Sequence, residues 1–276
     1  MNKINTVLLS STLHDPELKF MKLMNPILPM IETLFKERIV CCTPSTRKEV
    51  LNFLKAEGFK VVVGNSMDQV GNYKLSIQTS LKYITNSKTQ KILYIDFDRL
   101  IHWLDTYPEE LSDVMSKNRE VDYLHIGRTS RAFETHPRTQ KETEDIVNEI
   151  GSKILGFSEK KDIISVCFLI SKELGEQIIK IKNSTITGFY SSWPIIFWNI
   201  AESKRYIEVE GLEWETPDQF KDEIDKIGYD KWLTIFQSAN EWRKRVKLLH
   251  EGLLELSQFT EFNFEIIFEK VNNSNI

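Results

Sequence analysis

Cysteine is scarce in this chain, and long hydrophobic runs are absent. The three cysteines, Cys41, Cys42 and Cys167, lie in apolar runs and show neither a disulfide framework nor zinc-ligand spacing, so we expect three buried free thiols. No run of about 18 apolar residues occurs, which argues against a transmembrane helix. The N-terminal residues are polar and the apolar run after them is broken by His14 and Asp15, so we expect no secretory signal and a cytoplasmic protein.

The chain also lacks an excess of basic residues. The 36 Lys and Arg residues are outnumbered by 40 Asp and Glu residues, and no long basic run occurs, which argues against nucleic acid as a partner. Internal repeats, low-complexity segments and a Pro/Gly/Ser-rich linker are lacking as well. The 276 residues, with 41% hydrophobic content, suffice for one large domain with a C-terminal elaboration.

Strand and helix patterns alternate over the first hundred residues. Continuous apolar runs predict strands, and apolar residues three to four apart predict helices between them. This alternation predicts an α/β fold, with a mostly parallel sheet and helices on both faces. The expected strands are 6–11, 38–43, 59–63 and a fourth from 91 onward, and the expected helices are 18–35 with kinks at Pro26 and Pro29, a helix from the capping-box pattern Thr46-x-x-Glu49 to Gly58, and one through Ile77, Leu81 and Ile84.

The most informative motif is the pair Asp96 and Asp98, at the end of the apolar run 91–98. Alternate strand residues project to the same side, so the two carboxylates should lie together where the strand ends. Open α/β sheets bind ligands there. Mg²⁺ or Mn²⁺ takes one or two protein carboxylates and completes its shell with water and phosphates, so the pair predicts a divalent-metal site for a diphosphate. The alternative is a pair of solvated surface acids.

With this motif after its fourth strand, the chain resembles the GT-A family of nucleotide-sugar glycosyltransferases over roughly residues 6–136. The resemblance implies transfer of a sugar from a nucleotide diphosphate-sugar donor with Mg²⁺ or Mn²⁺, where Asp98 holds the metal and Asp96 either ligates the metal as well or binds ribose. Lys74 stands where the family more often has arginine. The implied donor contacts at the ends of the first and third strands and on the following helix are Ser10, Ser11, Asp15, Ser66 and Lys74.

Cationic side chains gather after a predicted fifth strand over residues 121–127. We expect segment 128–138 to be a mobile loop in which Arg128 and Arg131 act as catalytic anion-binding groups, because guanidinium groups match phosphate oxygens. The alternative is a solvated loop paired with acidic neighbours. His136 is a candidate third metal ligand, because GT-A enzymes often add a downstream histidine to the two acids, and the alternative is a structural histidine.

The second half carries candidates for acceptor binding. Segment 187–198 is rich in aromatic residues, and Tyr190 and Trp193 are candidate acceptor residues because aromatic faces stack on sugar rings. Packing in the core is the alternative for both. A carboxylate of the acidic stretch Glu208 to Glu215 is a candidate base for an acceptor hydroxyl, and the alternative is a solvated acidic strand edge.

Helical patterns occupy most of the rest. A second capping-box match, Thr139-x-x-Glu142, predicts a helix to about Leu155, and apolar spacing beyond Gly228 predicts one amphipathic helix of about 25 residues. That helix could pack on the domain or form a homodimer. The expected division is a nucleotide-sugar-binding half of a single GT-A domain, an acceptor-side half, and a C-terminal helix with its tail, over residues 1–136, 137–228 and 229–276.

These observations together predict a metal-dependent glycosyltransferase with an unknown acceptor. A sugar-phosphate nucleotidyltransferase shares the sheet, but no Gly-rich loop with a basic residue follows the first strand. A phosphatase of the HAD type would carry its Asp-x-Asp on the first strand, whereas three strands precede it here. A non-catalytic nucleotide-sugar-binding or assembly protein that uses the C-terminal helix is the third alternative.

Overall fold

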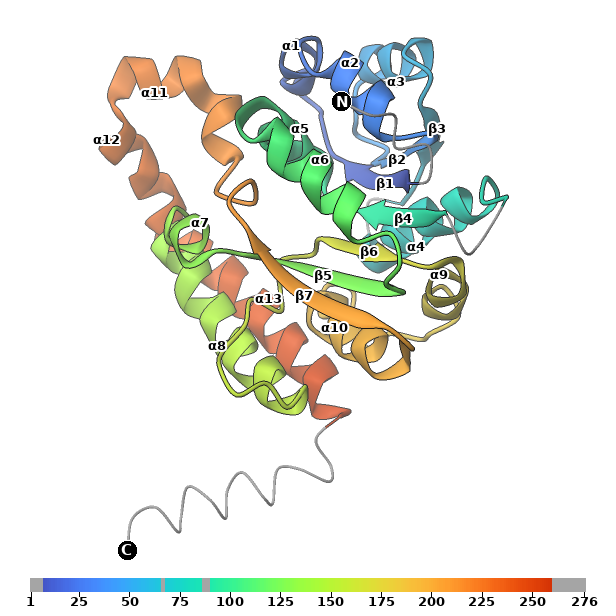
Figure 1. Cartoon of the computed structure of the whole chain (residues 1–276). Coiled ribbons are helices and arrows are strands. Elements are labelled where there is room, and N and C mark those ends of the chain that lie inside the picture. The colour runs from blue at the N-terminus through green and yellow to red at the C-terminus, as the bar shows by residue number, and fades with distance from the viewer. Residues whose placement is uncertain (1–6, 66–67, 86–89, 260–276) are drawn as a thin grey trace, which may run out of the picture.

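One mixed sheet organises the molecule (Figure 1). The computed structural model describes residues 7–65, 68–85 and 90–259. Seven strands lie in the order β3-β2-β1-β4-β6-β5-β7. β6 runs antiparallel to both of its neighbours, and the other neighbouring pairs are parallel. The strands are β1 (Val7–Leu13), β2 (Arg38–Cys42), β3 (Lys60–Val63), β4 (Lys91–Tyr94), β5 (Tyr123–Arg128), β6 (Phe168–Ile170) and β7 (Lys204–Val209).

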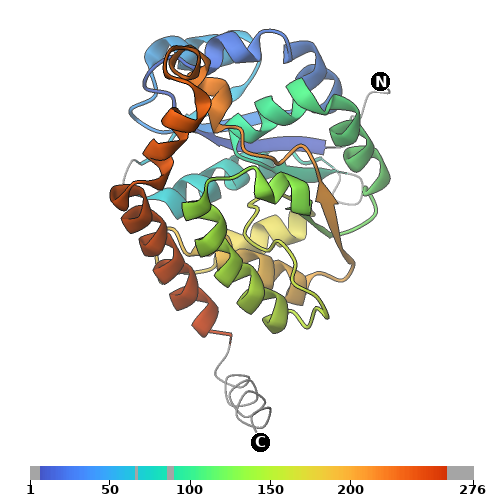
Figure 2. The same ribbon diagram turned by 90° about the vertical axis from the view of Figure 1, so that its left-hand side faces the viewer.

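The helices lie on both faces of this sheet, so the predicted α/β fold class is confirmed (Figures 1 and 2). The predicted break of the first helical segment at its prolines is also confirmed. The helices are α1 (Phe20–Met24), α2 (Leu28–Leu34), α3 (Lys48–Ala56), α4 (Gln69–Leu81), α5 (Phe97–Thr106), α6 (Pro108–Lys117), α7 (Ser130–Glu134), α8 (Arg138–Ile154), α9 (Lys172–Ile178), α10 (Phe189–Ile200), α11 (Lys221–Ile227), α12 (Tyr229–Leu233) and α13 (Ala239–Ser257), with 3₁₀ helices η1 (Thr216–Phe220) and η2 (Thr234–Gln237).

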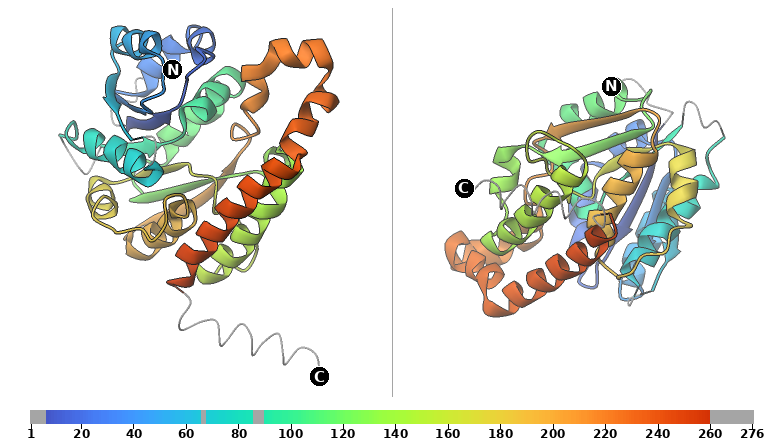
Figure 3. Two further views of the ribbon diagram at one scale, coloured as in Figure 1. Left: turned by 180° about the vertical axis from the view of Figure 1, so that it is seen from behind. Right: turned by 90° about the horizontal axis from the view of Figure 1, so that it is seen from below.

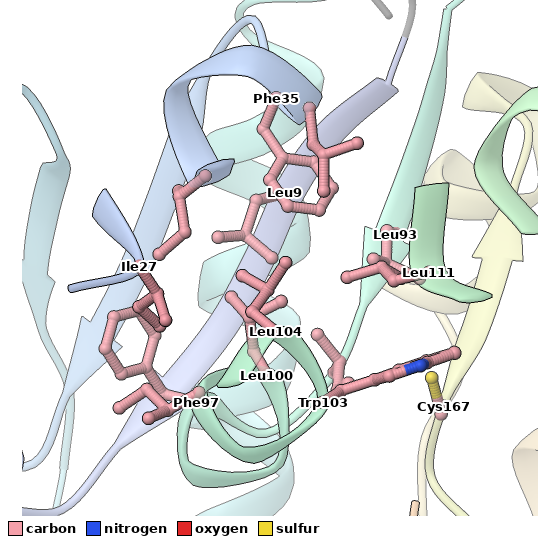
Figure 4. Packing of buried hydrophobic residues seen from close by; sticks show 14 of the residues in the cluster. Leu9, Ile27, Phe35, Leu93, Phe97, Leu100, Trp103, Leu104, Leu111 and Cys167 are labelled. Carbon is pink, nitrogen blue, oxygen red and sulfur yellow. The ribbon is translucent and has the colours of Figure 1, made fainter. Parts of the chain in front are cut away.

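Alternate strand residues build a separate core on each face. Leu9 of β1 and Leu93 of β4 join the core beneath α1, α2, α3, α5 and α6, where Trp103 and Leu100 pack (Figure 4). On the opposite face, Tyr94 belongs to a core shared with α4, α9 and α10. Because neighbouring strand residues face opposite layers, the central strands are buried on both sides and read as continuous apolar runs.

The C-terminal helices differ from the single long helix predicted. Gly228, with φ of 84°, separates α11 from α12, and α13 begins only after Ser238, whose side chain accepts a hydrogen bond from the Glu241 amide. α13 then runs beside α8 and also contacts α10, so it packs on the domain (Figure 3). Val147 and Leu256 are buried in this contact.

Neither predicted capping box forms, although the two helices predicted from them, α3 and α8, are present. Thr46 instead donates to the Leu13 carbonyl oxygen, and Thr139 donates to the Phe236 carbonyl oxygen over 2.7 Å. α3 and α8 begin without a side-chain cap. The predicted stop at Gly58 is confirmed, since Gly58 follows α3 with φ of 79°.

The three cysteines are free and buried, as predicted. Burial raises the pKa of Cys41 to about 12, so this thiol stays protonated and packs as a small apolar group. Within the described part of the chain, no helix combines the length and the apolar composition that crossing a membrane requires.

Candidate functional site

Asp96 and Asp98 lie just beyond the end of β4 and line one cavity. The alternation argument for their placement is wrong, because β4 ends at Tyr94 and Asp98 already belongs to the first turn of α5. Asp96 precedes that helix with an extended backbone. The two carboxylates are therefore brought together at the beginning of a helix, where its dipole favours negative charge.

The cavity has a volume of about 480 Å³ and opens at the carboxyl ends of β1, β2 and β4, beside the first turns of α4. This is the edge at which α/β sheets bind ligands, as the sequence predicted. Asn72 of α4 fixes one wall, because its side-chain amide accepts a hydrogen bond from the Asn65 backbone amide and donates one to the Asn65 carbonyl oxygen, each over 2.7 Å. We call this space the sheet-edge cavity; its other polar lining residues include Thr12, His14, Thr43, Gln69, Tyr73, Tyr190 and Gln219.

A chain of hydroxyl groups holds Asp96. Tyr73 donates to its Oδ1 atom over 2.6 Å, and Thr12 donates to the same atom over 3.0 Å. Tyr190 in turn donates to the Tyr73 hydroxyl over 3.1 Å, and the Gln69 amide donates to Tyr190. No described residue donates to Oδ2, so the carboxylate is fixed through one oxygen and keeps the other for a ligand.

Asp98 lies close to two other carboxylates, those of Glu215 and Asp96. Burial, followed by the charges of Glu215 and Asp96, raises the pKa of Asp98 to about 7. Arg99 partly balances this group, with its Nε atom 3.9 Å from Glu215. A bound cation would relieve the remaining repulsion among these carboxylates.

The two aspartates fit a hard divalent cation that keeps most of its ligands from water and phosphate. Mg²⁺ is usually bound through one or two carboxylates, and oxygen is the ligand that Mg²⁺ and Mn²⁺ prefer. Among the described residues, no group of three or more His, Cys, Asp or Glu side chains could enclose a metal. Such a site would therefore depend on Asp96, Asp98 and the phosphates of the ligand.

His136 does not join the two aspartates. It is buried beside α7, with Nδ1 3.1 Å from the Ala132 carbonyl oxygen and Nε2 3.3 Å from Arg128. Burial, and then the charge of Arg128, lowers the pKa of His136 well below its ordinary value, so the ring is neutral. This placement agrees with the alternative expectation that His136 is a structural residue and not a metal ligand.

Three of the predicted donor-binding residues are used inside the fold. Ser10 donates to the Ser76 hydroxyl over 2.9 Å, and Ser11 donates to the Ile95 carbonyl oxygen over 2.6 Å. The Asp15 carboxylate accepts hydrogen bonds from the backbone amides at the start of α1. The end of β1 does reach the sheet-edge cavity, but through Thr12 and His14.

The other two predicted donor contacts have different outcomes. Lys74 lies on α4, but its ammonium group donates to the Ile181 carbonyl oxygen, and Lys74 is not among the residues that line the sheet-edge cavity. Burial lowers the pKa of Lys74. Ser66 lies outside the described residues.

The segment 128–138 is a strand end followed by helices, so the prediction of a loop is wrong. Arg128 is fully buried, where it binds Asp162 with two hydrogen bonds of 2.7 and 2.8 Å and Glu144 with one of 2.7 Å. Arg131 is half-exposed and pairs with Glu210 and Glu213. Neither arginine lines the sheet-edge cavity.

The aromatic segment divides between core and site. Trp193 is 1% exposed and packs against Phe189 and Phe168 in the core, so its assignment to acceptor binding is not supported by its position. Tyr190 lines the sheet-edge cavity and also a second, smaller cavity between α8, α10 and α13. Tyr190 therefore separates two cavities, and Asp96 lines both of them.

Sequence reasoning missed several residues here. Arg99 directly follows Asp98, and Tyr73 and Gln69 lie on the predicted third helix, but their partners are distant in the chain. Of the acidic stretch, Glu208 is exposed, and only Glu215 comes close to Asp98. When several acidic, arginine or aromatic residues follow one another, the sequence alone does not indicate which of them faces a binding site.

No protein-family model and no curated protein sequence matches the chain. Solved structures do match. Glucosyl-3-phosphoglycerate synthase from Mycobacterium tuberculosis, in complex with Mn²⁺, uridine diphosphate and glucosyl-3-phosphoglycerate, matches with a TM-score of 0.49 and 12% identity over 74% of this chain and 70% of that chain.

Two further structures resemble the chain at similar distance. Residues 1–349 of S. aureus TarS match with a TM-score of 0.44 and 15% identity over 94% of this chain and 73% of that chain. A CMP:2-keto-3-deoxy-manno-octonic acid synthetase in complex with CTP matches with a TM-score of 0.47 and 8% identity over 81% of this chain and 98% of that chain. These likenesses concern the path of the chain alone.

Proposed function

We propose that this protein is a glycosyltransferase that moves a sugar from a nucleotide diphosphate-sugar donor to an acceptor hydroxyl, assisted by Mg²⁺ or Mn²⁺. The observation that carries the proposal is the pair of carboxylates Asp96 and Asp98 in one cavity at the carboxyl edge of the sheet. The volume of about 480 Å³ lies within the range of roughly 300–1,000 Å³ that small-molecule sites occupy.

In the proposed reaction, the bond between the sugar's anomeric carbon and the diphosphate breaks, and the diphosphate leaves with the bonding electrons. The acceptor oxygen bonds to the anomeric carbon, and its proton passes to solvent water. Asp96 and Asp98 would hold the divalent cation, which stabilises the charge on the leaving diphosphate. Tyr73 and Thr12 fix the Asp96 carboxylate in one orientation, so it need not reorganise when the donor binds.

The nucleotide belongs, in this proposal, in the sheet-edge cavity. Thr12, Thr43 and Asn72 present hydroxyl and amide groups there, and Phe20 and Leu13 supply an apolar surface. Gln219 reaches the same cavity from η1, a segment of the second half of the chain. Donor binding would therefore depend on contacts from both halves.

A thermal-shift screen of UDP, GDP, their sugars and the nucleoside triphosphates, with and without Mn²⁺, tests the proposal. A donor present at about 100 times its Kd should add about 2.7 kcal/mol of stability. Asp98→Asn keeps the shape of the side chain but removes its charge, so it should abolish the Mn²⁺-dependent part of the shift. Asp105→Asn, an exposed aspartate on the same helix, is the matched control. If Asp98→Asn binds the nucleotide in Mn²⁺ as tightly as the parent protein, the metal assignment is wrong, and a shift only with nucleoside triphosphates would favour a nucleotidyltransferase.

A further inference from the structure

The second cavity, of about 260 Å³, adjoins the sheet-edge cavity at Asp96. Gln69 and Tyr190 line both spaces and are joined by a hydrogen bond, so they form the boundary between them. The remaining walls come from α8, α10, α13 and the segment that precedes β6. We call it the helical cavity. A molecule in it would lie next to a diphosphate bound at Asp96.

One polar side chain in its walls is buried, faces the cavity and has no hydrogen-bond partner among the described residues. Gln140 of α8 is 4% exposed, and no hydrogen bond joins its side-chain amide to another described residue. The hydroxyl of Ser191 on α10 also lacks a partner in the described chain, but it lies against Gly252 of α13 and is closed off from the cavity. Buried polar groups are normally paired, because leaving them unpaired costs free energy. A ligand with hydroxyl groups in the cavity would satisfy the Gln140 amide.

The lining also has an apolar side. Val147, Leu248 and Leu249 present aliphatic surface from α8 and α13. Sugar rings and polyols combine C–H surface with hydroxyl groups, so they match a cavity that is apolar on one wall and offers amide and hydroxyl groups on another. The volume is below the range of roughly 300–1,000 Å³ for larger ligands, which limits the occupant to one small unit.

The charges around the cavity are already balanced. Arg245 of α13 lies with Nε 3.5 Å from Glu241 and Nη1 3.9 Å from Glu144. Arg99 has Glu215 as its neighbour. No excess of positive charge is left for a phosphate or carboxylate, and binding an anion would break these pairs.

We propose that the helical cavity binds the acceptor of the transfer as one neutral polyhydroxylated unit, a sugar ring or a small polyol, and that Gln140 is a specificity-determining residue for it. The statement that the bound molecule is the acceptor rests on the proposed function. It assigns α13 a part in substrate binding, since Leu248 and Leu249 form a wall of the cavity.

Binding measured without chemistry tests the assignment. The probes are glucose, galactose, mannose and glycerol as neutral ligands, glucose 6-phosphate and gluconate as anions, and maltoheptaose as a polymer, each followed by saturation-transfer NMR on the full chain. A neutral monosaccharide or glycerol should bind, and Gln140→Met should weaken it by about tenfold, the loss of roughly one hydrogen bond. The affinity for UDP with Mn²⁺ should not change.

Gln140→Met should fold normally, because replacing an unpaired buried amide with an apolar group of similar size removes a desolvation penalty. Gln78→Met, at an exposed position of α4, is the matched control and should change no affinity. Anionic probes or maltoheptaose that bind more tightly than neutral monosaccharides, equal affinities in Gln140→Met, or no binding of any probe would overturn the inference. Displacement of the neutral sugar by UDP-glucose but not by UDP would assign the cavity to the sugar of the donor and also overturn it. Failure of UDP to bind while the neutral sugar behaves as expected would count against the proposed function alone.

Discussion

Tyr73 on α4 donates a hydrogen bond of 2.6 Å to Oδ1 of Asp96, across 23 residues of sequence. Burial, and then the charge of Asp96, raises the pKa of Tyr73 well above its ordinary value. The hydroxyl therefore stays protonated at any physiological pH and remains a donor. This bond ties the orientation of a proposed metal ligand to the packing of a helix on the other face of the sheet from α5.

Tyr73→Phe should weaken Mn²⁺-dependent nucleotide binding by about 10–100-fold, the usual effect of removing a partner of a metal ligand. The free energy of unfolding should fall by only about 1 kcal/mol, because the ring remains packed. Tyr123→Phe is the matched control, since Tyr123 lies in the same core and its hydroxyl contacts His125. Calorimetric titration of Mn²⁺ and UDP into both variants measures the difference, and an unchanged affinity in Tyr73→Phe would contradict the role given to this bond.

Arg128→Met should destabilise the protein by about 3–5 kcal/mol, because it leaves Asp162 and Glu144 buried without their cation. The same change at Arg138, an exposed residue paired with Glu142, should cost less than about 1 kcal/mol. Urea unfolding measures both. An Arg128→Met protein of parental stability that has lost activity would restore the catalytic assignment of this arginine.

Trp193→Ala should cost about 3–5 kcal/mol of stability, because the indole is surrounded by aromatic side chains of the core. Tyr229→Ala, at an exposed position, should change stability by about 0.5 kcal/mol or less. Thermal unfolding of the two variants gives the comparison. If Trp193→Ala melts with the parent protein, the core assignment fails.

His102 should make stability depend on pH. Its Nδ1 lies 2.6 Å from Asp218 and its Nε2 lies 3.1 Å from Glu213, and only a protonated ring can donate to both. Burial lowers the pKa of His102, but the hydrogen bonds to Asp218 and Glu213 outweigh it, so the pKa is raised. The contribution is therefore fully present below the unfolded value of about 6.5 and is lost as the pH rises through the folded pKa.

The measurement compares urea unfolding of the parent protein and His102→Gln at about pH 5.5 and about pH 9. The parent protein should be more stable than the variant by a larger margin at the lower pH. His250→Gln, at an exposed position, is the control and should show no such trend. An equal margin at both values would show that folding leaves the pKa of His102 unchanged.

The strands β1, β2 and β4 could be predicted because they are buried on both faces, which leaves continuous apolar runs in the sequence. The edge strand β3 is partly exposed, but its run is apolar as well. The position of Asp96 followed from that, since the carboxyl edge of a parallel sheet is where ligands bind. The second half was less predictable. β6 has only three residues, and its antiparallel direction depends on neighbours that no local pattern reveals.

The roles of individual polar residues depended on partners far along the chain. Ser10 looked like a ligand-binding residue at a strand end, but Ser76 occupies its hydroxyl. Arg128 looked like an anion-binding residue, but Asp162 and Glu144 neutralise it. The sequence shows which side chains carry chemistry, whereas only the tertiary structure shows which of them are already engaged.

The place of β6 between β4 and β5 determines the order in which the sheet can be completed. β4 pairs with β1 on one side and with β6 on the other, yet β6 lies some 75 residues further along the chain. During synthesis, the N-terminal sheet of β3, β2, β1 and β4 can assemble while one edge of β4 still lacks its partner. That edge consists of Lys91–Tyr94, all buried in the finished protein. A newly made chain therefore exposes an aggregation-prone strand until residue 170 has emerged, and truncation before β6 should yield an insoluble product.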